Sequence, residues 1–208
     1  MLNSDCEVYE GSIDEMVSFA EKNSDAGIIG PMIINSDGSI QLSCRRFPSL
    51  IIAGLHTILS SFLPNNRFSR HYKMADREKG LPFEADWVSG SAMLVRRDAL
   101  KDTGLLDEGY FMYVEDIDLC YQMHRKGWKV YYYPHARILH HIGGSTKGSQ
   151  VAYCIIMQKS ILHFYLKNYK KDPKILLIPI LVIVLGIRIA VTFLKGSFTK
   201  KVKKREKE

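Results

Sequence analysis

The sequence predicts an α/β domain followed by a hydrophobic and basic C-terminal segment. The chain has 208 residues, of which 46% are apolar and 25% charged, a composition that excludes a collagen-like or wholly disordered protein. Residues 1–158 contain both helical and strand-like patterns. Residues 159–208 combine a long apolar stretch with many of the basic side chains. We therefore expect one domain over residues 1–158 and a distinct region over residues 159–208.

The first elements are a helix and a short strand. Residues 10–23 place apolar side chains at positions 13, 16, 17 and 20, which is the spacing of one helix face. Ser12 and Glu15 have the spacing of a capping box, so we expect their side chains to close the N-terminus of this helix. Residues 27–30 predict a buried strand that Pro31 should end.

The later elements follow from the same patterns. A hairpin is expected over residues 33–42, because a turn containing glycine separates two apolar runs. Residues 48–82 give no clear pattern, and we expect variable, substrate-facing structure there. After them the sequence predicts a strand over 92–95, a helical turn over 97–101, a helix over 114–126 that ends at Gly127, and a strand over 129–133 that Pro134 closes.

The basic excess is confined to the C-terminal part of the chain. The net charge is +7 at pH 7, yet residues 1–158 carry −3, because positive charges gather in residues 159–174 and 195–208. A nucleic-acid-binding domain would carry positive charge across its folded face, so we expect no nucleic-acid partner. The basic end instead favours contact with an anionic membrane surface.

Cysteine usage and the first residues indicate a reducing, cytoplasmic setting. The cysteines lack the short spacing of a zinc site or a redox motif, so we expect buried, reduced thiols at Cys6, Cys44, Cys120 and Cys154. Residues 1–11 have neither the positive start nor the apolar run of a secretory signal.

Asn3 and Asp5 form the first of three polar groups that are candidates for chemistry. They are separated by one residue, so in an extended chain both oxygens would point the same way and could share one Mg²⁺ or Mn²⁺ ion. Residues 3–5 are also typical of an ordinary turn.

The other two groups lie later in the chain. Glu115, Asp116 and Asp118 begin the expected helix, where acids are favourable near the positive end of the helix. Three of them beside apolar residues also fit a half-buried site in which one carboxylate is tuned as a base. His140 and His141 precede a glycine loop, which suits metal or phosphate binding as well as a solvated surface turn.

Residues 87–146 resemble the C-terminal half of family 2 glycosyltransferases, especially the rhamnosyltransferase-like members that build bacterial cell-surface polysaccharides. The resemblance extends over residues 2–170, since residues 2–5 are similar to the family's Leu-Asn-Pro-Asp metal motif with Ser for Pro. The matching positions are residues 27–31, 37–41 and 46–48, Gly90, Arg96, Arg97, residues 104–108, Phe111, Tyr113, residues 115–120, Gly127, Trp128, Pro134, Ala136, His140, Gly143 and Ser145.

The resemblance implies a GT-A fold with a Rossmann-like mixed sheet, and inverting transfer from a nucleotide diphospho-sugar, with rhamnose as the suggested sugar. It implies that Asp5 and His140 hold a divalent cation, Mg²⁺ or Mn²⁺, which offsets charge on the leaving diphosphate. Asn3 would join these two residues in binding the donor diphosphate. Asp116 would be the general base that deprotonates the acceptor hydroxyl.

The resemblance also implies an acceptor side, formed by Trp87, Gly90, Glu115 and Asp118. The acceptor would be a lipid-linked sugar or a growing polysaccharide in cell-surface glycan synthesis. Trp87 would stack on the apolar face of a sugar, although burial in a core is the more frequent fate of a lone tryptophan.

Family members place a nucleotide-binding half before the metal motif, whereas this chain begins at the motif. We therefore expect an incomplete GT-A domain that is the C-terminal portion of a longer enzyme. A separate N-terminal polypeptide would then supply the donor-binding half. The alternative is a non-catalytic truncated homologue that serves as a membrane-bound partner of a donor-binding polypeptide.

Residues 175–194 are apolar apart from Arg188 and contain one helix disruptor, Pro179. The stretch is just long enough to span a bilayer core, and a buried globular helix is the alternative. Lys-rich segments flank both sides, so the positive-inside rule favours a kinked re-entrant or interfacial hairpin over a crossing. We expect residues 159–208 to attach the protein to the cytoplasmic face of the bacterial inner membrane through this segment and its polybasic tail.

Overall fold

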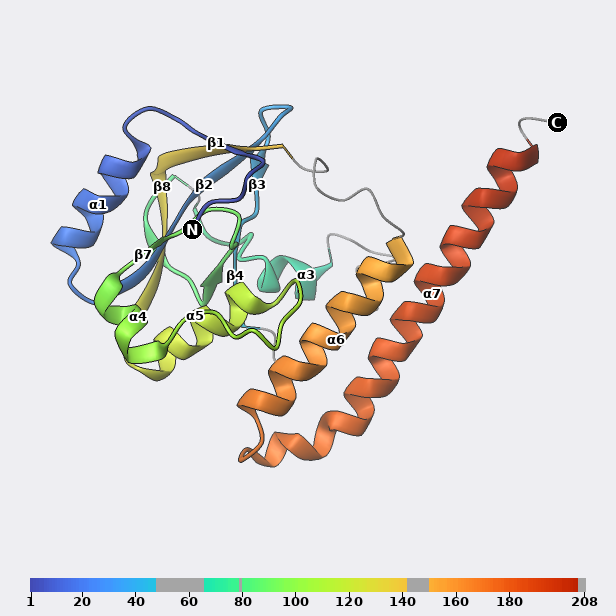
Figure 1. Cartoon of the computed structure of the whole chain (residues 1–208). Coiled ribbons are helices and arrows are strands. Elements are labelled where there is room, and N and C mark those ends of the chain that lie inside the picture. Colours follow the sequence, from blue (N-terminus) through green and yellow to red (C-terminus); the bar gives the residue numbers. More distant parts are fainter. Residues whose placement is uncertain (48–65, 79, 142–149, 206–208) are drawn as a thin grey trace.

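A mixed β-sheet and a projecting pair of helices make up the structure, a computed structural model that describes residues 1–47, 66–78, 80–141 and 150–205 (Figure 1). The six-stranded sheet has the order β1-β8-β2-β3, with β5 paired to β8 and β7 paired to β2. Its strands are β1 (Cys6–Val8), β2 (Ala26–Asn35), β3 (Ile40–Gln41), β5 (Phe83–Glu84), β7 (Leu94–Val95) and β8 (Lys129–His140), and β4 (Cys44–Arg45) and β6 (Trp87–Val88) form a second, two-stranded sheet.

The central strands β2 and β8 are parallel to each other and are both longer than the sequence predicts. We expected Pro31 and Pro134 to end them, but each strand continues past its proline. The reason is a register shift: Pro31 pairs with Tyr133 while the next residue of β2 pairs with Arg137, so residues 134–136 have no counterpart on β2. A proline lacks a backbone donor, and an irregular point in the ladder accommodates it at little cost.

Alternation along β2 and β8 packs helices on both faces of the sheet. Ile28 and Tyr132 are buried in the main hydrophobic cluster together with α5 (Glu115–Arg125). Their neighbours Ile29 and Tyr133 are buried in a second cluster with α1 (Ser12–Lys22). Because successive side chains of a strand point to opposite faces, the sheet lies between α1 and α5. The expected mixed α/β architecture is confirmed.

Helix α1 has the predicted position, but the capping box at its start is wrong. Its N-cap residue is Gly11, at φ +75°, and no side chain caps the helix. Ser12 instead donates through Oγ to the Arg137 carbonyl and accepts from the Arg137 N–H, both at 3.0 Å. Glu15 accepts a 2.7 Å hydrogen bond from the Tyr133 hydroxyl. Both side chains therefore bind the helix to β8, and this competes with local capping.

Several other expectations are confirmed. Strands β2 and β3 form the predicted hairpin, with Gly38 at φ +80° in its turn. Helix α5 is followed by Gly127 at φ +86°. Helices α3 (Arg67–Tyr72) and α4 (Arg97–Thr103) complete this part of the fold, while residues 48–65 and 79 of the expected variable region lie outside the described residues.

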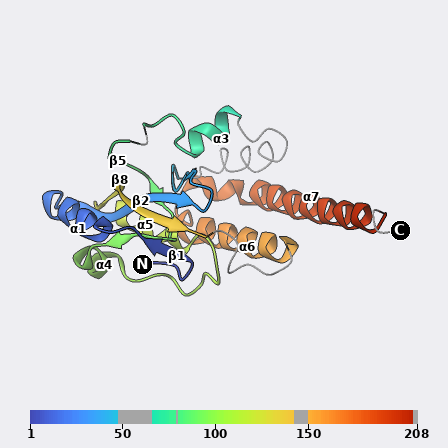
Figure 2. The ribbon, with the colours of Figure 1, turned by 90° about the horizontal axis from the view of Figure 1, so that it is seen from above.

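The C-terminal region is an antiparallel pair of helices that extends to one side of the sheet (Figure 2). It contains α6 (Gln150–Asn168), the 3-10 helix η1 (Pro173–Leu177) and α7 (Ile178–Arg205). Pro179 falls in the first turn of α7, where a missing donor is harmless, and the helix is continuous from Ile178 to Arg205. Within the described residues one stretch, Pro173–Leu194, is long and apolar enough to cross a membrane, and only 11% of that window is buried.

The division expected at residue 158 falls inside α6. Phe164 and Tyr165 from α6, and Leu181 and Leu185 from α7, belong to the same hydrophobic cluster as α5 and the sheet. The near half of the helix pair is therefore part of the domain core, while neighbouring apolar residues of α7, such as Ile180 and Ile183, are exposed.

Candidate active site

The start of α5 is held in an uncommon backbone conformation. Tyr113 and Val114 have φ values of +67° and +72°, and Val114 is the N-terminal cap residue of the helix. The left-handed region is strained for a bulky or β-branched residue, and such strain collects at functional sites. This turn places Glu115 and Asp116 in the first turn of the helix.

Asp116 is bound by backbone donors. Its Oδ2 accepts from the Gly90 N–H at 2.9 Å, and its Oδ1 accepts from the Ile117 N–H at 2.8 Å. Burial raises the pKa of the carboxyl, and the two N–H groups and the charge of Arg45 oppose that rise. A carboxylate with a raised pKa is a better proton acceptor than an ordinary aspartate.

Gly90 allows the close approach to Asp116. A side chain at this position would bring its Cβ within 3.1 Å of the Asp116 Cβ, which is tighter than normal packing. Glu115 lies beside them, half-buried, and its Oε2 has no hydrogen-bond partner among the described residues. Burial raises the pKa of Glu115 too, and the neighbouring Asp116 adds to the effect.

Asp5 and His140 come together through strand pairing rather than through an extended tripeptide. Residues 3–5 enter a turn in which the Cys6 N–H donates to the Asn3 carbonyl at 3.2 Å, as the alternative interpretation held. Strand β1 then pairs Cys6 with His140 of β8. As a result, His140 Nε2 lies 3.4 Å from Asp5 Oδ1.

These two side chains fit a divalent cation. His140 Nδ1 lies 3.3 Å from Gln41 Oε1, and a hydrogen bond donated there would leave Nε2 with a lone pair facing the Asp5 carboxylate. A carboxylate oxygen and an unprotonated imidazole nitrogen at this separation can share one metal ion. Asn3 has an exposed side chain next to them, and its backbone N–H donates to the Ser91 carbonyl at 2.9 Å.

Cys6 is a third member of this cluster that the sequence did not single out. Its sulfur lies with the Asp5 and His140 ligand atoms in a group within 4.8 Å of one another. Burial, followed by the charge of Asp5, raises the pKa of the thiol, and Sγ donates to the Ser91 carbonyl at 3.4 Å. A protonated thiol is a poor metal ligand, so we keep Asp5 and His140 as the ligand pair.

One short segment joins the two groups. The Gly90 N–H binds Asp116, and the carbonyl of the next residue, Ser91, accepts from Asn3 and Cys6. The side chains of Ser89 and Ser91 are 3.1 Å apart across Gly90. Asp116 and the Asp5 cluster are therefore held by adjacent residues of the same segment.

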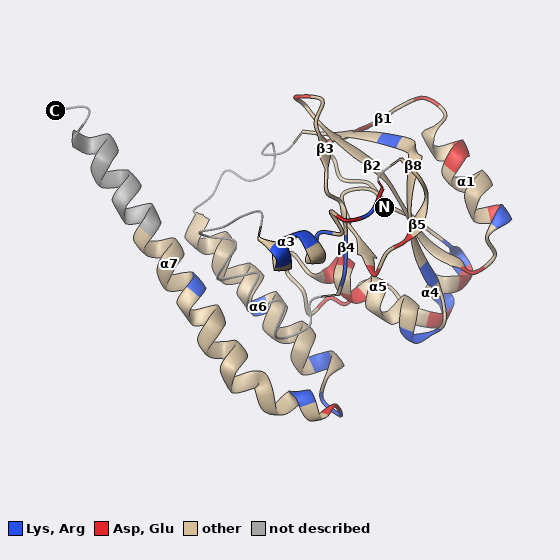
Figure 3. Cartoon of the chain, turned by 180° about the vertical axis from the view of Figure 1, so that it is seen from behind, with Lys and Arg blue, Asp and Glu red and all other residues tan. Residues whose placement is uncertain are grey.

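Trp87 lies in the core instead of offering its ring to a sugar. It is 5% exposed, its Nε1 donates to the Arg46 carbonyl at 3.0 Å, and the Arg45 guanidinium covers the ring at 4.9 Å from the centroid. Trp87 is therefore a core residue, which was the alternative to sugar stacking. In Figure 3 the basic colour at β4 appears on the same side of the molecule as the acidic start of α5.

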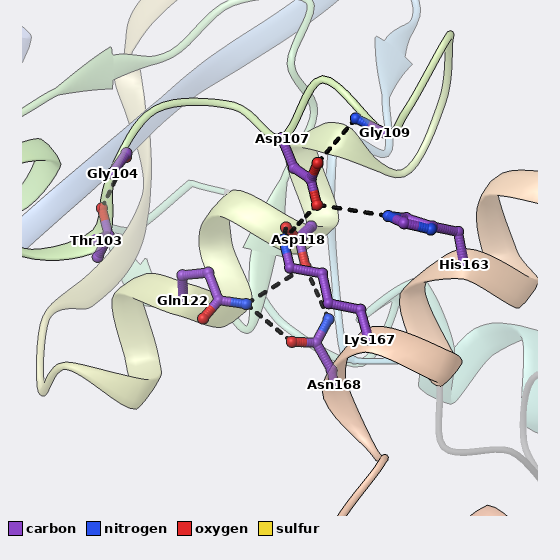
Figure 4. Close-up of polar contacts among 9 residues, drawn as sticks. All are labelled: Thr103, Gly104, Asp107, Gly109, Asp118, Gln122, His163, Lys167 and Asn168. Carbon is purple, nitrogen blue, oxygen red and sulfur yellow. Dashed lines mark hydrogen bonds and ion pairs between the residues drawn. The ribbon is translucent and has the colours of Figure 1, made fainter.

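Asp118 is also directed away from the Asp116 contacts, into a polar network between α5 and α6 (Figure 4). It is 3% exposed and accepts from Lys167 Nζ and Asn168 Nδ2, each at 2.7 Å. Lys167 also binds Asp107 at 2.6 Å, and this contact is the main reason that the pKa of Asp107 falls to about 2. These contacts make Asp118 an anchor for α6, and we leave it out of the acceptor site.

His141 has local partners of its own. Its Nε2 lies 2.9 Å from Glu7 Oε1 and its Nδ1 lies 3.0 Å from Ser36 Oγ, both at the surface. The glycine loop that follows, including Gly143 and Ser145, lies outside the described residues.

The chain belongs to the glycosyltransferase like family 2, whose model matches residues 2–155. It is 39% identical over 164 residues to N-acetylglucosaminyl-diphospho-decaprenol L-rhamnosyltransferase of Mycobacterium tuberculosis, covering 78% of this chain and 52% of the relative. It is 43% identical over 56 residues to Rhamnosyltransferase WbbL of Escherichia coli, covering 27% of this chain and 21% of the relative. The chain thus spans about half the length of the mycobacterial relative.

Among solved structures, the crystal structure of GalNAc-T7 with UDP, GalNAc and Mn²⁺ superimposes with a TM-score of 0.45. The two chains are 16% identical, and the match covers 83% of this chain and 35% of the other. A TM-score this low gives the likeness no weight for the function of the site.

Proposed function

We propose that this chain carries the acceptor-side and base-bearing part of an inverting glycosyltransferase. The observation that carries the proposal is the environment of Asp116, a carboxyl with a raised pKa that two backbone N–H groups orient. Membership of the glycosyltransferase like family 2 supports this chemistry. The donor would be a nucleotide diphospho-sugar.

Asp116 would act as the general base. It would take the proton from an acceptor hydroxyl while that oxygen attacks the anomeric carbon and the bond to the nucleotide diphosphate breaks. Gly90 would fix the carboxylate in place, and Glu115, whose Oε2 is unpartnered among the described residues, would orient the acceptor through a hydrogen bond.

Asp5 and His140 would hold a divalent cation, Mg²⁺ or Mn²⁺, and Asn3 would add a polar contact to the donor diphosphate. When bound, such an ion offsets the charge that develops on the leaving diphosphate. The support is the fit of a carboxylate and an imidazole nitrogen 3.4 Å apart.

The names of the relatives suggest the sugar and the acceptor. The mycobacterial relative is an L-rhamnosyltransferase that acts on a diphospho-decaprenol-linked N-acetylglucosamine, and the Escherichia coli relative is also a rhamnosyltransferase. We infer transfer of rhamnose to a lipid-linked saccharide, or to a polysaccharide, in cell-surface glycan synthesis. The exposed apolar stretch Pro173–Leu194 supports attachment to a membrane, and the flanking basic residues favour the cytoplasmic face of the bacterial inner membrane.

A transfer assay tests the proposal. The full chain in detergent is mixed with a nucleotide diphospho-rhamnose, a divalent cation and an N-acetylglucosaminyl-diphospho-polyprenol, with and without a separate donor-binding polypeptide. Asp116→Asn should lower the rate by at least about 10²-fold, as expected for loss of a general base. Asp98→Asn is the matched control, because Asp98 is exposed and its ion pair is with Lys101 on α4.

Two outcomes would contradict the proposal. No transfer in either mixture would refute the assigned activity. A rate that Asp116→Asn leaves within about threefold of wild type would refute the base assignment, since a general base contributes far more. If that retained rate also required the separate polypeptide, it would favour the non-catalytic partner of a donor-binding polypeptide.

A further inference from the structure

A polar cavity lies between α6 and α7, at the end of the helix pair away from its turn. Its volume is about 280 Å³. The residues that matter in its lining are Tyr113, Tyr153, Cys154, Gln158, Arg188 and Thr192. The cavity is separate from the contacts of Asp116 and of Asp5, and the proposed function makes no use of it.

One face of α7 changes from apolar to polar residues where the cavity begins. Leu181, Leu185, Arg188 and Thr192 follow one another at helical spacing along this face. Leu181 and Leu185 are buried in the main core, whereas Arg188 and Thr192 line the cavity. The interface between the two helices is therefore apolar near the turn and polar beyond it.

Gln158 is the polar residue of α6 at this point, and it is 3% exposed. Its Oε1 has no hydrogen-bond partner among the described residues, and its Nε2 meets only a distant acceptor, Cys154 Sγ, at 3.8 Å. An unpaired buried polar group is unfavourable, and a polar ligand in the cavity would complete it. A carboxamide can serve such a ligand as a donor and as an acceptor.

Arg188 supplies a positive charge inside an apolar stretch. It is the one charged residue among residues 175–194 and is half-buried. An ionisable residue in a segment suited to a membrane is costly, and it typically marks a site for a charged ligand. The planar guanidinium binds phosphate oxygens in pairs, which makes phosphate the natural ligand class.

The cavity is connected to the active site through the segment before α5. Tyr113 lines the cavity and lies two residues before Glu115. Ser160 of α6 donates to the Met112 carbonyl at 2.8 Å, so the helix that carries Gln158 is fixed to the same segment. A ligand in the cavity would thus lie next to the turn that positions Asp116.

We propose that this cavity binds the diphosphate head group of the lipid-linked acceptor, with Arg188 on the phosphate oxygens, the Gln158 Nε2 group donating to a phosphate oxygen and Gln158 Oε1 accepting from a hydroxyl of the attached sugar. This inference rests on the proposed function, because it names how that site recognises its acceptor. The isoprenoid chain would follow the apolar surface of α7, where Ile180, Ile183 and Ile187 are exposed. The sugar attached to the diphosphate would then extend toward Asp116.

Binding of a short isoprenoid diphosphate tests the inference without any transfer reaction. The full chain in nanodiscs of neutral phosphatidylcholine is titrated with farnesyl diphosphate in a calorimeter. Arg188→Gln should weaken binding at least about tenfold, the effect expected for loss of a charge-assisted contact to phosphate. Lys174→Gln removes the same charge outside the cavity and should leave the Kd within about twofold. Equal binding by Arg188→Gln and wild type would overturn the inference.

Gln158→Met gives a second test, which separates a role in ligand binding from a purely structural role. It keeps the shape of the side chain but removes both the unpaired oxygen and the Nε2 donor, so the melting temperature should stay equal or rise. Binding of farnesyl diphosphate should nevertheless fall at least about threefold, as expected for loss of a neutral hydrogen bond. Unchanged binding in a folded Gln158→Met protein would remove Gln158 from the site and refute the inference as stated.

Three further compounds show whether the cavity recognises an isoprenoid diphosphate, a free phosphate or an anionic lipid: inorganic pyrophosphate, farnesol and phosphatidylglycerol. Inorganic pyrophosphate should bind more weakly than farnesyl diphosphate, and farnesol should not compete with it. Farnesol that binds as tightly as the diphosphate would overturn the inference, and so would complete loss of farnesyl diphosphate binding in nanodiscs of phosphatidylglycerol, which would assign the cavity to anionic lipids in general. Asp116→Asn should bind normally, so a failed base assignment and a failed acceptor site give different results.

Discussion

Asp116 and Asp118 lie two residues apart at the start of α5, yet the two sides of this helix turn are opposite environments. On one side, Asp116 is oriented by the N–H groups of Gly90 and Ile117, and burial raises its pKa. On the other, Asp118 is buried against the ammonium group of Lys167 and the amide of Asn168. Neighbouring acids of one motif therefore have different surroundings: Asp116 fits the role of the proposed base, whereas Asp118 fixes α6 to α5.

The difference explains how three acids can share one helix start. A favourable helix N-terminus offsets part of the repulsion between them, but only by fractions of a kcal/mol each. The remaining charge is divided, since Lys167 pairs with Asp118, while burial raises the pKa values of Glu115 and Asp116. Removing Lys167 should therefore destabilise the contact between Asp118 and α6 more than the surroundings of Asp116.

The largest effect on stability is expected for Lys167→Met. The substitution would leave Asp118 buried without its cation, which costs about 3–5 kcal/mol in a fully buried pair. Because about a third of the Lys167 side chain is exposed, at 34%, we expect a loss of about 2–3 kcal/mol in the free energy of unfolding. Urea unfolding measures it.

The control for this substitution is Lys101→Met. Lys101 and Asp98 form an ion pair in which both side chains are largely exposed, so its removal should change stability by less than about 1 kcal/mol. Similar losses in the two variants would show that the Lys167 network is an ordinary surface pair.

A smaller effect is expected from acid. The pKa of Asp107 is lowered from 3.8 to about 2, chiefly by Lys167, so ionised Asp107 stabilises the folded state above pH 3.8. That stabilisation should be lost as the pH falls from about 4 to about 2. Acid titration followed by circular dichroism should show this loss in wild type and a weaker pH dependence over the same range in Lys167→Met. Identical acid profiles would contradict the assignment.

The smallest effect is expected for Gly90→Ala, which changes the surroundings of Asp116. The new Cβ would lie 3.1 Å from the Asp116 Cβ, so the carboxylate must move by a few tenths of an ångström. A shift of this size in a base should lower the transfer rate by about three- to tenfold, with little change in melting temperature. Gly80→Ala is the control, since its nearest neighbour would be the flexible Glu78 carboxylate at 4.0 Å. A wild-type rate for Gly90→Ala would show that the contact is irrelevant.

The order and type of the main elements could be predicted from the sequence, because apolar spacing and turn residues mark them locally. The helix over 114–126, the 33–42 hairpin and the family follow from such patterns. The strand ends could not be predicted, since Pro31 and Pro134 are tolerated only because the two strands shift register at the same level. The two prolines lie at the same register shift only in the folded sheet, so the sequence alone does not show it.

The candidate site was predicted in part. Asp5 and His140 were expected to meet, and they do, but the pairing of Cys6 with His140 brings them together rather than an extended metal motif. Trp87 and Asp118 carry the residue types of an acceptor site, and only their three-dimensional partners show that one is core and the other an anchor. The role of Lys167 gave no local signal, because its two carboxylates are 49 and 60 residues away in the chain.

Val114 combines a costly backbone with a buried side chain. Its left-handed conformation is unfavourable by about 1–3 kcal/mol, and burial of the side chain, which is 6% exposed, recovers a similar amount. The turn before Asp116 thus depends on tight packing around a valine rather than on a rigid loop. Warming should loosen such packing before it melts a six-stranded sheet, so the position of Asp116 would be the most heat-sensitive feature of the candidate site.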